Sequence, residues 1–197
     1  MEKNTTITEQ TVKHTNDIEN IMSECGNGKA KMISRCTDKR CKFDNKFTPR
    51  DKIFSTVTHR IYDCVIPPGT TNLITCSASN LIYLLTCNNC YFQYVGETAC
   101  PLRQRFARHQ FNINHPQKPS NCKLLTDHFT KGLCKDAQYS VQIIEKLEGN
   151  GRTERDVLDP TKSKLRKERE LYWMLTLRTV YPYGLNDRIG NDFKTKK

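Results

Sequence analysis

Long hydrophobic runs are missing from this sequence: apolar stretches end after five residues, as at 81–85, whereas a membrane-spanning helix needs ~20. A secretory signal is missing as well, since Met-Glu-Lys-Asn-Thr-Thr lacks the charged and then apolar regions of such a segment. We therefore expect an intracellular protein with no transmembrane segment.

Apolar and acidic residues are also scarce. The hydrophobic fraction is 36% and the mean hydropathy is −0.71, so part of the 197 residues is expected to carry no core. Asp and Glu number 21 against 32 Lys and Arg, which gives a formal net charge of +11. Such an excess attracts polyanions at long range and indicates nucleic acid or an acidic membrane surface as the partner.

Cysteine, in contrast, is abundant, with ten residues. Intracellular compartments keep thiols reduced, so a cysteine-rich intracellular chain more often binds zinc than forms disulfides. A secreted, disulfide-linked protein is the weaker interpretation, because it would require an export signal.

Composition divides the chain into four parts. Residues 1–24 are polar and aperiodic, which is typical of a disordered leader. Residues 25–78 hold five cysteines among basic residues and predict a small cysteine-supported subdomain, with short strands around the turn at 67–69. Residues 79–190 are better patterned and predict the main domain, and 191–197 form a basic tail.

A β-hairpin is predicted near the start of the main domain. Two segments rich in strand-forming residues, 81–85 and 91–95, flank an asparagine pair at 88–89. If that pair is a two-residue turn, Tyr83 lies opposite Tyr94 and both rings share one face of the sheet. An ordinary aromatic pair within a core is the alternative interpretation.

A helix is expected to follow, with Pro101 in its first turn. Its core-facing stripe, at i, i+3, i+4 and i+7, consists of Leu102, Arg105, Phe106 and His109. An arginine on such a stripe is costly unless something pairs it. A partly exposed salt bridge is the simpler explanation of Arg105.

A second helix is predicted from about 162 to 180, and it places a carboxylate among core residues. The same spacing is repeated by Glu170, Trp173, Met174 and Leu177. Either Glu170 pairs with Arg105 as a buried structural bridge, or the two line a polar cleft in which both are used.

Two phenols, a guanidinium, a histidine and a lone carboxylate in a basic protein suit phosphodiester hydrolysis. That reaction needs a divalent metal on a hard oxygen ligand, a base to activate water and a cation for the phosphoryl oxygens. A single glutamate would hold one metal ion rather than a pair.

These residues stand in motifs that resemble a known family. Five motifs match, in order, those of GIY-YIG endonucleases: Leu81-Ile82-Tyr83, Tyr94-Val95-Gly96, Leu102-x-x-Arg105-x-x-x-His109, Arg169-Glu170-Leu171-Tyr172-Trp173 and Gly184-Leu185-Asn186. Three further features resemble the endonuclease of Penelope-like retroelements: Cys87-x-x-Cys90, Asp127-His128-Phe129 and Pro182-x-Gly184-Leu185-Asn186.

The resemblance implies an α/β fold with a small three-stranded antiparallel sheet flanked by helices, and metal-dependent nicking of DNA. It gives Tyr83 the role of general base and Tyr94 that of a hydrogen-bonding partner for water or phosphate. Arg105 would stabilise the pentacovalent phosphate, and Glu170 would bind Mg²⁺ or Mn²⁺.

His109 is implied as an accessory catalytic or positioning residue, and Asn186 as a residue that orders the site. Two positions depart from the family. Leu81 replaces the first glycine of the namesake motif, although the tyrosine supplies the chemistry. Asp44 replaces the last cysteine of a Penelope-type cluster that begins Cys36-x-x-x-x-Cys41, which argues against zinc there.

The resemblance also bears on partners and location. No Tyr-x-Asp-Asp polymerase motif occurs in the sequence. The resemblance implies DNA rather than a membrane as the main partner and a nuclear location, and the missing polymerase motif implies a reverse transcriptase encoded elsewhere. A zinc-supported module that binds nucleic acid without cutting it is the alternative, but Glu170 favours catalysis, because a binder gains nothing from an anion near phosphate.

A structural zinc site is expected at the tip of the hairpin. In the sheet that the resemblance implies, the third strand, at 139–144, pairs with the first and begins beside that tip. The expected ligands are Cys87, Cys90, His128 and Cys134. His115 is the rival ligand, and a buried free thiol at Cys134 with a solvated imidazole at His128 is the alternative without metal.

Overall fold

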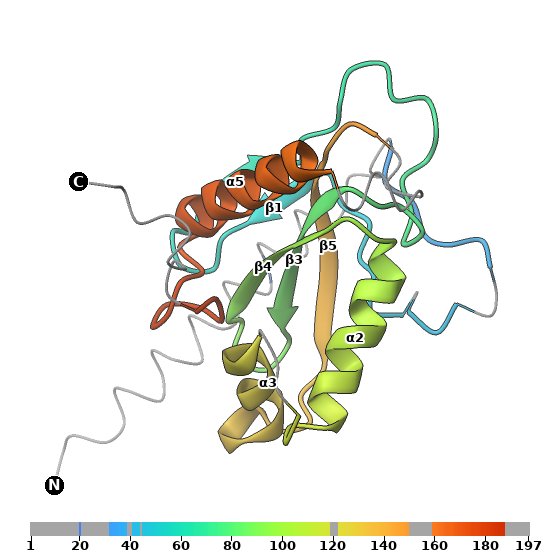
Figure 1. Cartoon of the computed structure of the whole chain (residues 1–197). Helices are drawn as coiled ribbons and strands as arrows, with labels where there is room; N and C mark the ends of the chain where they lie inside the picture. Colours follow the sequence, from blue (N-terminus) through green and yellow to red (C-terminus); the bar gives the residue numbers. More distant parts are fainter. Residues whose placement is uncertain are drawn as a thin grey trace, which may run out of the picture.

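The structure, a computed structural model, describes residue 20 and residues 32–38, 41–43, 45–118, 122–149 and 159–187. The expected leader, apart from residue 20, and the basic tail lie outside the described residues. In chain order the elements are β1 (Lys52–Phe54), β2 (Ile61–Asp63), β3 (Leu81–Cys87), β4 (Gln93–Thr98), α2 (Leu102–Asn114), α3 (Lys123–Thr130), η1 (Gly132–Cys134), β5 (Tyr139–Lys146) and α5 (Pro160–Leu177) (Figure 1). None of the described helices is long and apolar enough to cross a membrane.

The expected three-stranded antiparallel sheet is confirmed. Its strand order is β4-β3-β5, so the first strand of the hairpin is central and the third strand pairs with it. Every residue of β3 is buried. Helices α2 and α3 cover one face of the sheet and α5 covers the other, which places the expected site residues on opposite sides of the edge strand β4 (Figure 1).

The predicted hairpin register is wrong by two residues. Tyr83 pairs with Gly96 and Leu85 with Tyr94, so the connection is longer than the asparagine pair. The turn is closed by a hydrogen bond from the Tyr91 N–H to the Cys87 carbonyl, and Tyr91 itself takes the left-handed φ of 61°. Because a strand alternates faces every residue, a shift of two leaves Tyr83 and Tyr94 on the same face.

The cysteine-rich segment contributes to the same core as the main domain. Phe47 is fully buried in the core under α2 and α3, and Ile53 of β1 is fully buried against α5. The expected strands around the turn at 67–69 are largely absent from the described chain: β2 pairs with β1 rather than across that turn. This segment needs few apolar residues of its own, because they pack into a core to which the sheet and the helices also contribute.

Helix α5 begins and ends close to its predicted limits. Asp159 caps it by accepting hydrogen bonds from the backbone N–H groups of Thr161 and Lys162, and Pro160 occupies the first position. It ends at Leu177, before Arg178 takes a left-handed conformation, rather than at 180. For α2 the predicted start is wrong by one position, because Pro101 is the cap and Leu102 the first helical residue.

Candidate functional site

The two motif tyrosines lie together on the face of the sheet that α2 covers. Tyr83 is fully buried and Tyr94 nearly so, and their ring centroids are 6.3 Å apart. Phe106 of α2 meets the Tyr83 ring edge-on at 5.3 Å. Burial raises the pKa of both phenols, so each is neutral in the isolated protein.

The Tyr83 hydroxyl is held by two side chains of α2, which stand one turn apart on the predicted stripe. Nε2 of His109 lies 2.7 Å from Tyr83 Oη, and Nε of Arg105 donates to the same oxygen at 3.1 Å. Burial, and then the charge of Arg105, lower the pKa of His109 to about 3, which leaves the imidazole neutral. A neutral Nε2 can accept the phenol proton, because Arg105 can only donate.

Arg105 stays charged despite its partial burial. Burial, the largest single effect, lowers its pKa, but the hydrogen bond to Tyr83 and the neighbouring Tyr94 and Cys122 together outweigh it, so the net shift is upward. Its Nη2 donates to Sγ of Cys122 at 3.8 Å, and that sulfur lies 3.4 Å from Tyr94 Oη. The sequence analysis missed Cys122, which precedes α3; no local motif marks it, and only the packing of α3 against α2 brings it here.

Gly96 makes room for the Tyr83 hydroxyl. A Cβ on Gly96 would overlap Tyr83 Oη and would approach Cε1 of Tyr94 to 2.8 Å. Because the β4 backbone passes so close to the phenol, the last position of the Tyr94-Val95-Gly96 motif has room only for a residue without a Cβ.

Glu170 reaches the same stretch of β4 from α5. Its Oε1 accepts a hydrogen bond of 3.1 Å from the backbone N–H of Glu97, the residue after Gly96. Burial, and next the charge of Glu97, raise the pKa of Glu170 to about 7. Among the described residues no ion pair joins Glu170 to Arg105, so the buried bridge considered above does not form.

An ion pair between a buried arginine and a partly exposed glutamate joins α5 to β4 beside Glu170. Arg166, one turn before Glu170, donates from Nε to Glu97 at 2.9 Å and from Nη1 to Asn80 at 2.8 Å. Its side chain is 4% exposed. The sequence analysis missed this pair, although Arg166 extends the stripe of Glu170 and Trp173 by one turn and could have been found by that spacing.

Asn186 holds the other side of the β4 backbone. Its Oδ1 accepts from the Val95 N–H at 2.9 Å and its Nδ2 donates to the Val95 carbonyl at 2.7 Å, as a paired strand would. Thr179 donates to the same Oδ1 at 2.7 Å. The side chain is buried and acts on the tyrosine site through Val95, which stands between Tyr94 and Gly96.

The hairpin tip carries a group of side chains that could hold a metal ion. The Cys87, Cys90, His128 and Cys134 ligand atoms all lie within 4.8 Å of one another, with Cys90 Sγ 3.5 Å from His128 Nε2. A hydrogen bond from Cys90 lowers the pKa of Cys87, while the same pairing raises that of Cys90. His115 is outside this group, at the end of α2, where its Nδ1 lies 2.9 Å from the Phe111 carbonyl.

A second group, Cys36, Cys41 and Cys76, also brings its sulfur atoms within 4.8 Å of one another. Each of the two groups could hold a metal ion, and their cysteine and histidine ligands are compatible with zinc. No disulfide joins the described cysteines.

Comparison of the chain with protein-family models, with curated proteins and with solved structures gives no significant match.

Proposed function

We propose that this protein is a divalent-metal-dependent endonuclease of the GIY-YIG type that nicks DNA, with its closest resemblance to the endonucleases of Penelope-like retroelements. The observation that carries the proposal is the Tyr83 hydroxyl, buried between Nε2 of His109 and Nε of Arg105. A phenol used only for packing has no need of a charged donor and a neutral acceptor on the same oxygen.

Tyr83 activates the attacking water in this proposal. Because burial raises its pKa, the phenol does not act as a standing phenolate. A proton leaves water for Tyr83 Oη while the phenol proton passes to Nε2 of His109, so Tyr83 stays neutral, His109 takes a positive charge and the negative charge goes with the oxygen that leaves phosphorus. The hydroxide that remains attacks phosphorus, and the bond to the leaving oxygen breaks.

Arg105 offsets the charge that develops on the phosphoryl oxygens. One of its nitrogens holds Tyr83, and the rest of the planar guanidinium offers further donors in a fixed geometry. The same side chain therefore fixes the phenol and meets the phosphate, which couples the position of the base to that of the substrate.

Glu170 is the proposed ligand for Mg²⁺ or Mn²⁺. The Glu97 N–H engages one carboxylate oxygen, and a carboxylate offers a second oxygen to a hard divalent cation. A bound cation would stabilise negative charge on the phosphate and the leaving oxygen. Its positive charge would also oppose the burial that raises the pKa of Glu170.

The four side chains at the hairpin tip are proposed to bind a structural zinc ion. Three sulfurs and one imidazole nitrogen converge from β3, the hairpin loop, α3 and η1, and this ligand type suits a closed tetrahedral site. Such an ion would join α3 to the sheet and so fix the side of the site on which Cys122 lies.

The test is Glu170→Gln, with Glu168→Gln as its matched control. Glu168 is on the same helix, but its side chain is 50% exposed and pairs with Lys164. We expect Glu170→Gln to lose Mg²⁺-dependent nicking and to bind DNA with equal or higher affinity, since an anion near phosphate is removed. Wild-type nicking by Glu170→Gln would overturn the proposed role.

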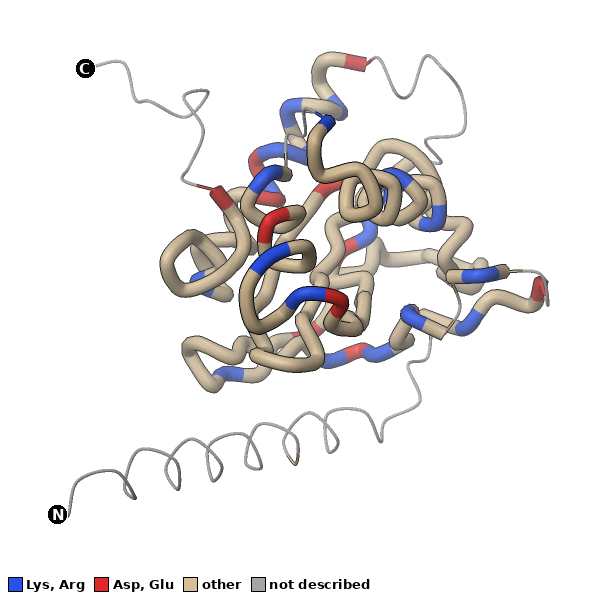
Figure 2. The backbone as a smooth tube through the Cα atoms, turned by 90° about the horizontal axis from the view of Figure 1, so that it is seen from below, with Lys and Arg blue, Asp and Glu red and all other residues tan. Residues whose placement is uncertain are grey.

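The basic surface fits a DNA substrate, although it also fits a protein that binds without cutting. Lys and Arg positions are spread over several elements of the fold rather than confined to one helix (Figure 2). Binding in the absence of any nicking would therefore favour the non-catalytic module. A reverse transcriptase partner and a nuclear location remain predictions.

A further inference from the structure

The second cysteine group joins two parts of the chain that are far apart in sequence. Cys36 and Cys41 precede β1, and Cys76 follows 35 residues after Cys41. Cys76 is fully buried, and Cys36 and Cys41 pack against the same core. Three thiols from two segments thus meet at one point beneath the surface.

The spacing of the sulfur atoms suits one shared metal ion. The Sγ atoms of Cys41 and Cys76 are 3.5 Å apart, and all three sulfurs lie within 4.8 Å. Sulfurs bound to one tetrahedral zinc at ~2.3 Å lie ~3.8 Å from each other. A disulfide would need ~2.05 Å between its sulfurs, so these sulfurs are not bonded to each other and are spaced closely enough to share one metal ion.

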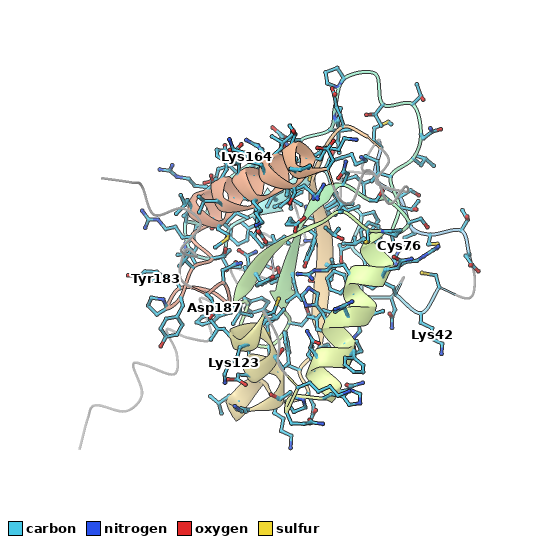
Figure 3. The ribbon with its side chains drawn as sticks, in the orientation of Figure 1. Lys42, Cys76, Lys123, Lys164, Tyr183 and Asp187 are labelled. Atoms are coloured by element: carbon cyan, nitrogen blue, oxygen red, sulfur yellow. The ribbon has the colours of Figure 1, made fainter. Side chains whose placement is uncertain are left out.

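Cys76 is attached directly to the first turn of α2. Its carbonyl accepts a hydrogen bond of 2.9 Å from the Arg103 N–H, and the Ala78 carbonyl accepts one of 2.9 Å from the Leu102 N–H. These carbonyls lie near a helix start that has no side-chain cap. Figure 3 labels Cys76 beside this end of α2.

The other two cysteines belong to a segment that packs along the same helix. Phe43, two residues after Cys41, stacks on Phe106 of α2 with ring centroids 4.7 Å apart. An ion held by both Cys41 and Cys76 would therefore fasten this segment to the helix that carries Arg105 and His109.

We propose that Cys36, Cys41 and Cys76 bind a second zinc ion, and that this ion connects the cysteine-rich segment to the start of α2. Sequence resemblance pointed to position 44 for the third ligand and so argued against zinc; the structure supplies Cys76 instead. Three thiolates leave one position of a tetrahedral ion open to a further ligand.

The first test is metal content by elemental analysis of the full chain. We expect about two zinc ions in the wild type, about one in Cys36→Ser or Cys76→Ser, and about two in the control Cys100→Ser, which alters an exposed cysteine outside both groups. Cys87→Ser should lose the other ion, and Cys36→Ser with Cys87→Ser should lose both. If Cys36→Ser and Cys76→Ser each contain as much zinc as the wild type, the proposal is wrong.

Two further variants separate ligand loss from misfolding. Cys36→His keeps a zinc-binding side chain at a partly buried position, so it should retain about two ions where Cys36→Ser retains one. Cobalt substitution should give a thiolate-to-cobalt absorption that falls in Cys36→Ser. Equal metal loss in the His and Ser variants, or a cystine found by alkylating the denatured wild type, would contradict the assignment.

Amide hydrogen exchange tests whether the ion stabilises the start of α2. Loss of the ion in Cys36→Ser should speed exchange at the Arg103 N–H, which is bonded to the Cys76 carbonyl, more than at residues in the middle of β3. Equal exchange at Arg103 in Cys36→Ser and the wild type would show that the ion does not hold the start of α2.

The proposal does not depend on nuclease activity, so zinc content and nicking can fail independently.

Discussion

Nε2 of His109 lies 2.7 Å from the hydroxyl oxygen of Tyr83, and both side chains are buried. This hydrogen bond links α2 to the central strand and gives the phenol an acceptor for its proton. The burial that lowers the pKa of His109 to about 3 keeps that acceptor neutral before the reaction. Because burial also disfavours a phenolate, Tyr83 can give its proton to His109 only while it receives a second proton from the attacking water in the proposed mechanism.

Tyr83→Phe removes the hydroxyl and with it this proton path, while the ring that packs in the core is kept. We expect a loss of ~10²-fold or more in nicking rate, because a general base is removed. The free energy of unfolding should fall by about 1–3 kcal/mol, since His109 and Arg105 lose a partner. Single-turnover nicking and urea unfolding measure the two effects.

Tyr139→Phe is the matched control for that variant. Tyr139 is also buried, and its hydroxyl donates to Gln110 at 3.2 Å, away from the five motifs. It should keep the wild-type rate. A folded Tyr83→Phe protein with an unchanged rate would reduce Tyr83 to a packing residue.

Arg105→Lys preserves the charge but loses the planar fork of donors. We expect the nicking rate to fall far more than the DNA affinity, because in the proposed mechanism the guanidinium contacts the phosphate while it holds Tyr83. Arg108→Lys, on the exposed side of the same helix, should affect both only slightly. Equal losses of affinity and rate in Arg105→Lys would indicate a simple phosphate anchor.

Glu170 should make stability depend on pH. Its pKa rises from 4.5 in the unfolded chain to about 7 in the fold, first because of burial. The folded protein then holds a proton that the unfolded chain has released, so stability falls as pH rises between those two values. Urea unfolding between about pH 5 and about pH 7 should show a steeper fall for the wild type than for Glu170→Gln.

The control for this dependence is Glu168→Gln, which should follow the wild-type curve. Mg²⁺ requires the ionised carboxylate, so added Mg²⁺ should raise the melting temperature more at about pH 8 than at about pH 6. Parallel curves for the wild type and Glu170→Gln, or an Mg²⁺ effect that Glu170→Gln retains, would remove Glu170 from the proposed metal site.

The proposed zinc site at the hairpin tip predicts a specific pattern of metal loss. Cys90→Ser, His128→Ala and Cys134→Ser should each lose one zinc ion, whereas His115→Ala should keep the wild-type content. Loss of this ion should also loosen the β3–β4 turn, seen as faster amide exchange at Tyr91. A zinc loss confined to His115→Ala would contradict the proposed ligands.

The sequence predicts the elements that carry the site better than it predicts their contacts. Hydrophobic periodicity places Arg105, His109 and Glu170 on the inward faces of two helices, and this is how the structure has them. The four residues at the hairpin tip could be grouped because the strand order of the sheet brings them to one end.

Contacts that depend on packing could not be read from the sequence. The hairpin register was wrong because the left-handed residue is Tyr91, which turn propensity does not favour, rather than an asparagine. Cys122 reaches the tyrosines, and Cys76 reaches Cys41, only through the three-dimensional arrangement of distant segments. The shared core of the cysteine-rich segment was missed for the same reason.

The most direct test of the central claim is a nicking assay on supercoiled plasmid with the full chain, with Mg²⁺ and with a chelator in its place. The account predicts conversion of supercoiled plasmid to nicked circles with Mg²⁺ and none with the chelator, with the conversion lost in Tyr83→Phe and Glu170→Gln. Plasmid that is bound but never nicked with Mg²⁺ or Mn²⁺, or nicking that survives in both variants, would contradict it.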